Sequence, residues 1–262
     1  MNNTKIIVAS HKAYEMPEFS SYLPLHVGAE GKEPFGFKGD NTGDNISLKN
    51  PYYCELTGLY WAWKNLDTEF LGLVHYRRYF SLKNNANIKK HGFFESVLND
   101  REIDRLTKEN DIIVPKKRRY YIETMYSHYK HTMFVEPLDT AREVIAEIFP
   151  EYLPYFDRHM KETGGHMFNM FIMKKDKLND YCEWLFRVLD EVEKRTDAEK
   201  YDSFHARFYG RLSELLLDVW ITKNGYAYKE VPVISPEKVN WIKKGGAFLL
   251  AKFTGKKYGK SF

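Results

Sequence analysis

Short apolar segments that turn polar at their ends alternate along this chain with longer segments of helical periodicity. KIIVAS (5–10) and DIIVP (111–115) are examples of the short segments. Residues 176–195 carry apolar side chains on one helical stripe, and residues 207–223 repeat this pattern. This alternation predicts an α/β fold with a mainly parallel central sheet flanked by helices, in a single domain.

Two segments in the first third of the chain carry more detailed predictions. NISLKNPYYCELTGLYWAWKNL (45–66) has apolar and aromatic residues near helical spacing, which predicts one helix with Asn50 as N-cap and Pro51 in its first turn. EFLGLVHYRRYF (69–80) predicts a strand, and the Gly-, Asp- and Asn-rich residues 27–44 predict a loop. The strand therefore ends in two arginines, which cannot be buried in a sheet without anionic partners.

The composition is that of an ordinary globular protein, with 43% hydrophobic and 29% charged residues. No apolar run approaches the roughly 20 residues that span a bilayer. Cys54 and Cys182 suggest no disulfide framework, and the first residues lead into a strand without the apolar core of a signal peptide. We therefore expect a cytoplasmic protein.

Residues 238–262 differ from the rest of the chain, because they contain seven lysines and no acidic residue, interleaved with Trp, Phe and Leu. This composition suits contact with an anionic membrane surface, and a loosely ordered solubilising tail is the alternative. We therefore divide the chain into one domain (1–237) and a basic aromatic tail (238–262). Attachment at the inner face of the cell membrane is an expected role of the tail.

Cationic side chains follow three of the predicted strands. They belong to three segments, which are Ser10-His11-Lys12, His75-Tyr76-Arg77-Arg78 and the run 115–119. Open α/β sheets bind ligands at the carboxyl ends of their strands, and guanidinium forks match phosphate oxygens. We therefore expect a phosphorylated ligand such as a nucleotide. The alternatives are structural ion pairs for Arg77 and Arg78 and, for the basic run, a solvated face.

Two further segments place polar residues beside apolar ones. In TGGHMFNMFIM, His166 and Asn169 follow two glycines and could hydrogen-bond a sugar, while a tight turn with His166 satisfied locally is the alternative. Glu214 interrupts the apolar stripe of a predicted helix. It is either a general base or the ion-pair partner of Arg211 or Arg207.

Several common motifs do not occur in the sequence. There is no G-x-x-x-x-G-K-[ST] loop, so P-loop phosphoryl transfer is not expected. The sequence also has no G-x-S-x-G elbow and no Cys/His metal spacing. A nucleic-acid-binding module that uses KKRRYY and the basic tail is an alternative from another class. The net charge is only +4, and the basic residues are scattered over several segments, which argues against nucleic acid as a partner.

Five blocks together make the chain recognisable as similar to a known family. NISLKNPYYCELTGLYWAWKN, FLGLVHYRRYF, DIIVPKKRRYY, GGHMFNMFIM and RLSELLLDVW resemble the DUF4422 family, over about residues 4–235. These are bacterial capsular and exopolysaccharide biosynthesis proteins that resemble GT-A glycosyltransferases, so the resemblance implies a GT-A-like domain with a Rossmann-like central sheet. The resemblance implies transfer of a sugar from a UDP-sugar to a glycan or lipid-linked acceptor, with galactose as pyranose or furanose the suggested sugar. A non-catalytic carbohydrate-binding scaffold is the alternative.

The resemblance also implies roles for residues. The donor-binding candidates are Ser10, His11, Lys12, Asp44, Lys49, Tyr53, His75, Tyr76, Arg77, Arg78 and Asn169, with Glu55 beside them on the first long helix. Glu214 is the first candidate for the catalytic base, and His166 is the second.

Metal dependence stays open at this point. GT-A enzymes commonly hold Mn²⁺ or Mg²⁺ with an Asp-x-Asp motif, but this chain has HYRR where the acidic pair is expected. Either Arg77 and Arg78 replace the charge of the metal, or His75 and Asp44 help to hold one.

Overall fold

The computed structural model describes residues 3–83, 88–90 and 92–236, and its centre is a seven-stranded sheet in the order β10-β6-β9-β4-β1-β2-β3. The strands are β1 Thr4–Ser10, β2 Tyr22–His26, β3 Lys38–Gly39, β4 Phe70–His75, β6 Ile112–Pro115, β9 Phe171–Lys174 and β10 Lys229–Val231. Two small antiparallel pairs lie beside it, formed by β5 Tyr79–Phe80 with β11 Val233–Ile234 and by β7 Arg118–Arg119 with β8 Gly164–Gly165.

All strands of the central sheet except β9 run in one direction. β1 pairs in parallel with β2 and β4, and β10 pairs in parallel with β6. β9 is antiparallel to both of its neighbours, β4 and β6, so β4 and β6 share a direction. The predicted α/β fold with a mainly parallel sheet is therefore confirmed, and the polar ends of β1, β4 and β6 lie at one edge.

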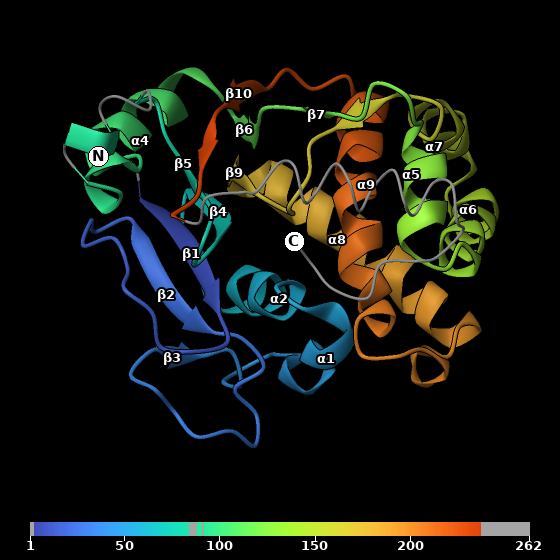
Figure 1. The fold of residues 1–262 in the computed structure, drawn as a ribbon, viewed down its shortest axis with the longest axis horizontal. Helices are drawn as coiled ribbons and strands as arrows, with labels where there is room; N and C mark the ends of the chain where they lie inside the picture. The colour runs from blue at the N-terminus through green and yellow to red at the C-terminus, as the bar shows by residue number, and fades with distance from the viewer. Residues whose placement is uncertain (1–2, 84–87, 91, 237–262) are drawn as a thin grey trace.

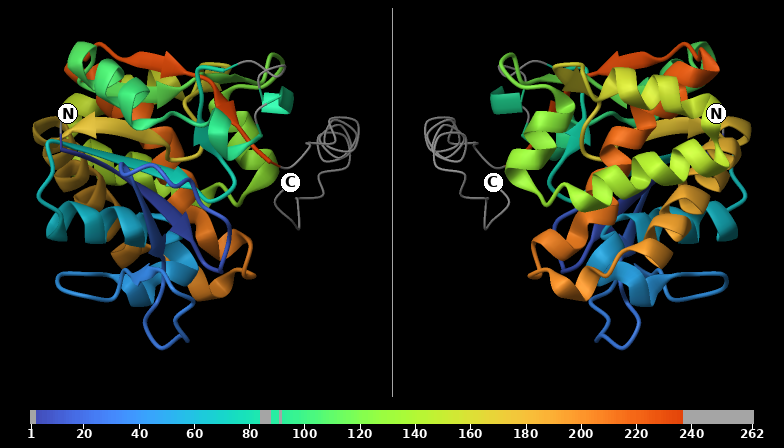
Figure 2. Two further views of the ribbon diagram at one scale, coloured as in Figure 1. Left: turned by 90° about the vertical axis from the view of Figure 1, so that its left-hand side faces the viewer. Right: turned by 90° about the vertical axis from the view of Figure 1, so that its right-hand side faces the viewer.

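The helices cover the two faces of the sheet unequally (Figure 1). They are α1 Asn50–Tyr53, α2 Leu56–Asn65, α4 Asp100–Glu109, α5 Met125–Thr132, α6 Glu136–Ile148, α7 Leu153–His159, α8 Lys175–Arg195 and α9 Phe208–Asn224. Alternate strand residues such as Ile7 and Leu71 pack with α2, α5, α6, α8 and α9 in the larger core. Ile6 and Phe70 face the smaller core with α4 on the opposite side, and Figure 2 shows α4 (green) and α2 (cyan) on either side of the strands.

The segment predicted as one strand over residues 69–80 is two strands joined by a turn. β4 ends at His75, the N–H of Arg78 donates to the carbonyl of His75 at 2.9 Å, and β5 begins at Tyr79. The two arginines are therefore turn residues at the end of a buried strand rather than strand residues.

The helix predicted over residues 45–66 is interrupted. Cys54 has φ 55° and ψ −130°, and it separates α1 from α2. Asn50 does not cap this helix, because Lys49 is the N-cap residue. Asn50 instead donates its side-chain amide to the carbonyl of Cys54 at 2.7 Å and so supports the break.

The long polar segment between β2 and α1 is held by one buried carboxylate, Asp40. It accepts the backbone N–H groups of Gly28 and Ala29 at 2.8 and 3.0 Å, and the hydroxyl of Thr57 at 2.6 Å. Ser47 donates a further hydrogen bond to it. The predicted loop over 27–44 is therefore ordered by charge-assisted hydrogen bonds and includes the short strand β3.

The described residues contain no helix that is both long and apolar enough to cross a membrane. The basic aromatic tail of residues 238–262 lies outside the described residues, and so does its predicted contact with a membrane surface.

We predict that Asp40→Asn lowers the free energy of unfolding by about 3 kcal/mol, because an amide group turns a donor toward the surrounding donors. Urea denaturation measures this change. Asp44→Asn is the matched control, because Asp44 is exposed, and we expect a change within about 0.5 kcal/mol. Equal effects of the two substitutions would contradict the structural role of Asp40.

Candidate active site

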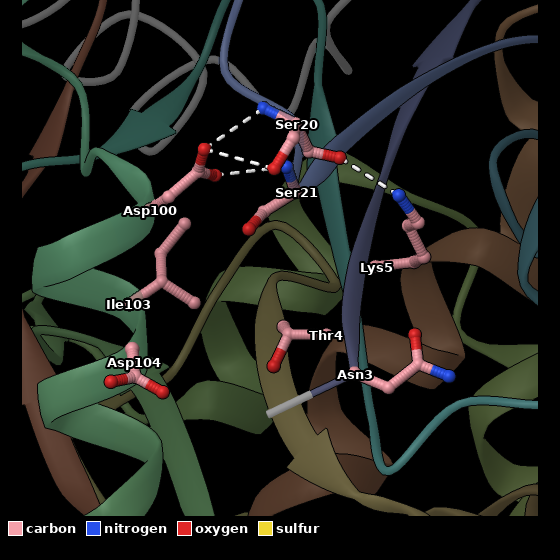
Figure 3. A pocket seen from close by; sticks show the side chains of 8 residues that line it. All are labelled: Asn3, Thr4, Lys5, Ser20, Ser21, Asp100, Ile103 and Asp104. Atoms are coloured by element: carbon pink, nitrogen blue, oxygen red, sulfur yellow. Dashed lines mark hydrogen bonds between the residues drawn. The ribbon is translucent and has the colours of Figure 1, made fainter. Parts of the chain in front are cut away.

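A small pocket of about 200 Å³ lies at the amino end of β1, and hydrogen bonds join several of the residues that line it (Figure 3). The carboxylate of Asp100 accepts the N–H of Ser20 at 3.1 Å and the N–H of Ser21 at 2.9 Å. Lys5 donates to the carbonyl of Ser20 at 2.8 Å. The bonds of Asp100 fasten α4 to the segment just before β2, and the bond of Lys5 fastens that segment to β1, so we assign this pocket a structural role.

A much larger cavity of about 1060 Å³ lies at the carboxyl ends of the strands. Its lining comes from the ends of β1 and β4, the break between α1 and α2, the segment after β6, α5, the loop before β9 and the start of α9. The lining residues are Ala9, His11, Val27, Asn50, Pro51, Cys54, Glu55, His75, Tyr76, Arg77, Arg78, Arg118, Arg119, Tyr120, Tyr121, Met125, His128, Tyr129, Thr132, Met133, Met167, Phe168, Phe204, Arg207, Gly210, Arg211, Glu214 and Leu215.

The charge in this cavity is strongly positive, because six arginines share it with only two carboxylates, Glu55 and Glu214. Burial lowers the pKa of Arg78, and the carboxylate of Glu214 raises the pKa of Arg211. Burial and the neighbouring Lys12 lower the pKa of His11. The cavity is therefore suited to an anionic ligand.

Aromatic rings and a thiol accompany several of these guanidinium groups. Arg77 lies 5.0 Å from the ring centroid of Tyr76, and Arg78 lies 4.6 Å from that of Phe168. The Nε–H of Arg207 donates to the sulfur of Cys54 at 2.9 Å. Burial raises the pKa of Cys54 to about 11, so its thiol keeps its proton near neutral pH.

Glu55 is tied to the loop before β9. Its Oε1 accepts the side-chain amide of Asn169 at 2.7 Å, and the same amide donates to the carbonyl of Gly210 at 2.9 Å. The Nε2–H of His75 donates to the carbonyl of Phe168 at 2.6 Å and lies 3.8 Å from Glu55. The end of β4, the helix break and this loop are thus joined around one carboxylate.

The wall formed by α5 and the segment before it carries aromatic rings, and a buried carboxylate, Glu123, lies behind these rings. The rings of Tyr120 and His128 stack at 3.8 Å, and Arg118 lies 5.4 Å from the Tyr120 ring. Glu123 contacts the Nδ1 atoms of His128 and His131 at 3.1 and 2.5 Å. Burial lowers the pKa of His128 to about 4, although Glu123 opposes the shift, so this ring is neutral near pH 7.

Backbone strain is concentrated at this cavity. The described residues include four non-glycine residues with positive φ: Cys54 (55°), Tyr121 (57°), Phe168 (82°) and Asn169 (51°). Three of them line the cavity, and Asn169 contacts Glu55. Positive φ is costly for residues with a Cβ atom, and such residues gather at active sites and ligand contacts.

Seven of the residues singled out in the sequence line this cavity: His11, Glu55, His75, Tyr76, Arg77, Arg78 and Glu214, and Arg118 and Arg119 of the basic run line it as well. Glu214 accepts a hydrogen bond from Arg211 at 3.1 Å, so the ion pair left open in the sequence is present. Asn169 lies behind the wall, where it holds Glu55. The strand-end rule thus located one real cluster of side chains.

Five other predicted donor residues do not line the cavity. The hydroxyl of Ser10 donates to the carbonyl of Lys12 at 2.6 Å, while the Lys12 side chain is exposed. Lys49 and the hydroxyl of Tyr53 both contact Glu193, at 2.5 and 3.1 Å. Asp44 is exposed and accepts a hydrogen bond from Tyr60 at 3.2 Å, outside the cavity lining to which His75 belongs.

The ring of His166, predicted as the second candidate base, does not line the cavity. Its side chain is fully buried away from the cavity lining, with Nδ1 2.6 Å from Asp218 and Nε2 3.1 Å from Glu230. Both ring nitrogens are occupied by carboxylates from α9 and β10. His166 therefore joins these elements to the end of β8, which is a structural task.

Three lining residues have a larger place in the cavity than the sequence predicted. Arg207 and Arg211 were expected only as ion-pair partners of Glu214, and Glu55 only as a donor contact. Arg207, Arg211 and Glu214 are spaced i, i+4 and i+7, which places them on one face of a helix. This spacing could have indicated a cationic helix face. Glu55 gave no comparable signal, because its position depends on the break at Cys54.

The residues in the cavity do not fit a divalent metal. No group of three or more His, Cys, Asp or Glu side chains among the described residues has the arrangement of a metal site. The two carboxylates of the cavity are engaged by Asn169 and Arg211 and are surrounded by arginines, which would repel a second cation.

Residues 5–225 match the family model described as "Domain of unknown function (DUF4422)". The chain belongs to the DUF4422 family. No curated protein matches this DUF4422 chain. Among solved structures, it is similar to the apo structure of the bifunctional glycosyltransferase WbbM, with 31% sequence identity and a TM-score of 0.81.

The alignment with WbbM covers 90% of this DUF4422 chain and 46% of the WbbM chain, so the chain spans about half the length of that protein. The α/β fold with its mostly parallel sheet thus has a glycosyltransferase-like structure. The resemblance recognised in the sequence is therefore confirmed in two respects, which are membership of the DUF4422 family and structural similarity to a glycosyltransferase.

We predict that Tyr121→Gly raises the free energy of unfolding by about 0.5–1 kcal/mol, because glycine adopts positive φ without steric cost. The Tyr121 side chain is 81% exposed, so its removal loses little packing. Tyr121→Ala is the matched control, since alanine keeps the strained conformation. Thermal denaturation of both variants checks the prediction, and a glycine variant no more stable than the alanine variant would contradict it.

Proposed function

We propose that this DUF4422 chain is a glycosyltransferase that transfers a sugar from a UDP-sugar to a glycan or lipid-linked acceptor. The observation that carries this proposal is the arginine-rich cavity at the carboxyl edge of a sheet whose fold is similar to that of WbbM. WbbM is bifunctional and this chain matches about half of it, so we propose a single transfer activity.

The phosphates of the donor are expected beside Arg77 and Arg78. These arginines follow β4 in a tight turn, where open α/β sheets bind phosphorylated ligands. Planar guanidinium groups bind phosphate oxygens in pairs, and both are oriented by the aromatic rings of Tyr76 and Phe168. A cavity of about 1060 Å³ has room for a nucleotide-sugar and part of an acceptor.

In the proposed reaction the acceptor hydroxyl loses its proton as its oxygen forms a bond to the anomeric carbon. The bond from that carbon to the diphosphate breaks, and its electron pair leaves with the diphosphate. The arginines stabilise the negative charge that develops on this leaving group, in the place of a metal ion. Because the donor set of the cavity does not fit a metal, we propose that this role belongs to the guanidinium groups alone.

The biological setting follows from the family resemblance. We propose that the transfer builds a capsular, exopolysaccharide or other cell-surface glycan, and galactose is the sugar that the resemblance suggests. We propose that this synthesis takes place at the cytoplasmic side of the membrane, where the lysine-rich residues 238–262 would contact anionic lipids.

A thermal-shift panel of nucleotide-sugars, with and without Mn²⁺, tests the proposed function. We expect UDP-sugars to raise the melting temperature more than other nucleotide-sugars do, with little dependence on Mn²⁺. Release of UDP from the stabilising donor then shows turnover. Binding without turnover would indicate a carbohydrate-binding scaffold, and no response to any donor would contradict the proposal.

We predict that Arg77→Ala weakens the binding of UDP by at least 10-fold, because a charge-assisted contact with phosphate contributes about 1.5–3 kcal/mol. Isothermal titration calorimetry measures the affinity. Arg105→Ala, which removes an exposed arginine on α4, is the matched control. Unchanged binding of UDP by the Arg77 variant would show that the diphosphate lies elsewhere.

A further inference from the structure

The cavity holds two carboxylates, and they differ in how the protein positions them. Glu214 lies inside the regular helix α9, where Oε1 pairs with Arg211 one turn away at 3.1 Å. Glu55 lies between α1 and α2, immediately after the strained residue Cys54. An ion pair at i, i+3 on a helix is a common structural arrangement, whereas a carboxylate placed by a strained break needs another explanation.

The strain around Glu55 comes from two separate segments of the chain. Cys54 has φ 55° on one side, and Phe168 and Asn169 have φ 82° and 51° on the other. Asn169 donates to Oε1 of Glu55, and Phe168 accepts from His75, whose Nε2 lies 3.8 Å from Glu55. Three strained residues thus converge on one side chain, and relaxing any of them would move this carboxylate or the groups that hold it.

The hydrogen bonds around Glu55 hold one of its oxygens. The side-chain amide of Asn169 faces Oε1, since the reverse orientation would place two acceptor oxygens together. This orientation leaves Oδ1 of Asn169 buried with no hydrogen-bond partner among the described residues. A buried oxygen without a partner is costly, so the contact with Glu55 is kept despite a local loss of stability.

The second oxygen of Glu55 is available to a ligand. The described residues give Oε2 no hydrogen bond, and Glu55 lines the cavity. The negative charge of Glu55 raises the pKa values of Arg207 and Arg211, after the larger effects of Cys54 and Glu214 respectively. It also opposes the lowering of the Arg78 pKa by burial. Glu55 therefore lies among the guanidinium groups that would hold a diphosphate.

We propose that Glu55, rather than Glu214, is the catalytic base of the transfer, a role that rests on the proposed function above. A sugar is bonded directly to the diphosphate that leaves, so its anomeric carbon lies close to the arginines that hold this group. Oε2 of Glu55 accepts the proton of the acceptor hydroxyl as the acceptor oxygen bonds to that carbon. The electron pair of the breaking bond leaves with the diphosphate, and Asn169 keeps the carboxylate oriented.

The substitution Glu55→Gln tests this role, because the amide oxygen still accepts from Asn169 but the group no longer takes up a proton. We expect the rate of UDP release from UDP-galactose, or from the UDP-sugar that binds best, to fall by about 10²-fold or more. Affinity for UDP, measured by calorimetry, is expected to be equal or higher, since a negative charge is removed beside the arginines.

Glu214→Gln is measured in parallel and is expected to lose less turnover than Glu55→Gln, while Glu183→Gln, an exposed site on α8, controls for the substitution itself. A larger loss in the Glu214 variant, or turnover by Glu55→Gln within about 10-fold of the unsubstituted protein, overturns the role of Glu55 alone. An unsubstituted protein that turns over no UDP-sugar overturns the transferase and the role together.

The same two measurements, turnover and UDP affinity, distinguish a loss of the catalytic base from a loss of turnover that reflects misfolding. If Glu55→Gln loses both turnover and UDP binding, Glu55 acts by shaping the cavity and the catalytic role is wrong. Glu55→Asp gives a second reading: the shorter carboxylate is expected to keep more turnover than the amide, because it can still accept a proton.

Discussion

The shared direction of β1, β4 and β6 is the constraint on which the rest of this site depends. Their backbone hydrogen bonds and the apolar residues on their two faces fix where each strand ends. Because the sequence turns polar and basic at those ends, the cationic side chains are brought to one edge without any direct attraction between them. The positive charge of the cavity is thus a consequence of sheet topology.

Six guanidinium groups in one cavity repel one another, and the structure reduces this repulsion only in part. Aromatic faces accept Arg77, Arg78 and Arg118, and two carboxylates supply negative charge. The remaining positive charge is held in place before any ligand arrives, so little reorganisation is needed when an anion binds. The strained residues fit this picture, because folding stability is given up where a side chain must be placed accurately.

The sequence predicted the parts of this protein that depend on local periodicity. The buried strands, the long helix α8 and the arginines after β4 follow from apolar patterns and from the strand-end rule. β2 was not predicted, since Pro24 and the flanking polar residues mask its pattern. The break at Cys54 was not predicted either, because a continuous helical pattern conceals it and the contacts that support it come from the tertiary fold.

For the candidate site, the sequence predicted the residues whose position follows from the end of a strand, but not those placed by distant contacts. Residues that directly follow a strand, such as His11, Arg77 and Arg78, could be placed in the cavity from their position in the sequence. The contacts of Lys49, Tyr53 and His166 could not be predicted, because their partners Glu193, Asp218 and Glu230 lie far away in the chain. Glu55 gains its importance from Asn169, which is 114 residues distant.

The reversed strand β9 has a consequence for synthesis of the chain on the ribosome. It lies between β4 and β6, but it is made about 60 residues after β6 and about 100 after β4. Until residue 174 has emerged, both of these strands present open, apolar edges that can pair with other chains. A nascent chain of this kind therefore depends on late completion of its sheet, and a truncation before β9 is expected to aggregate rather than leave a smaller folded unit.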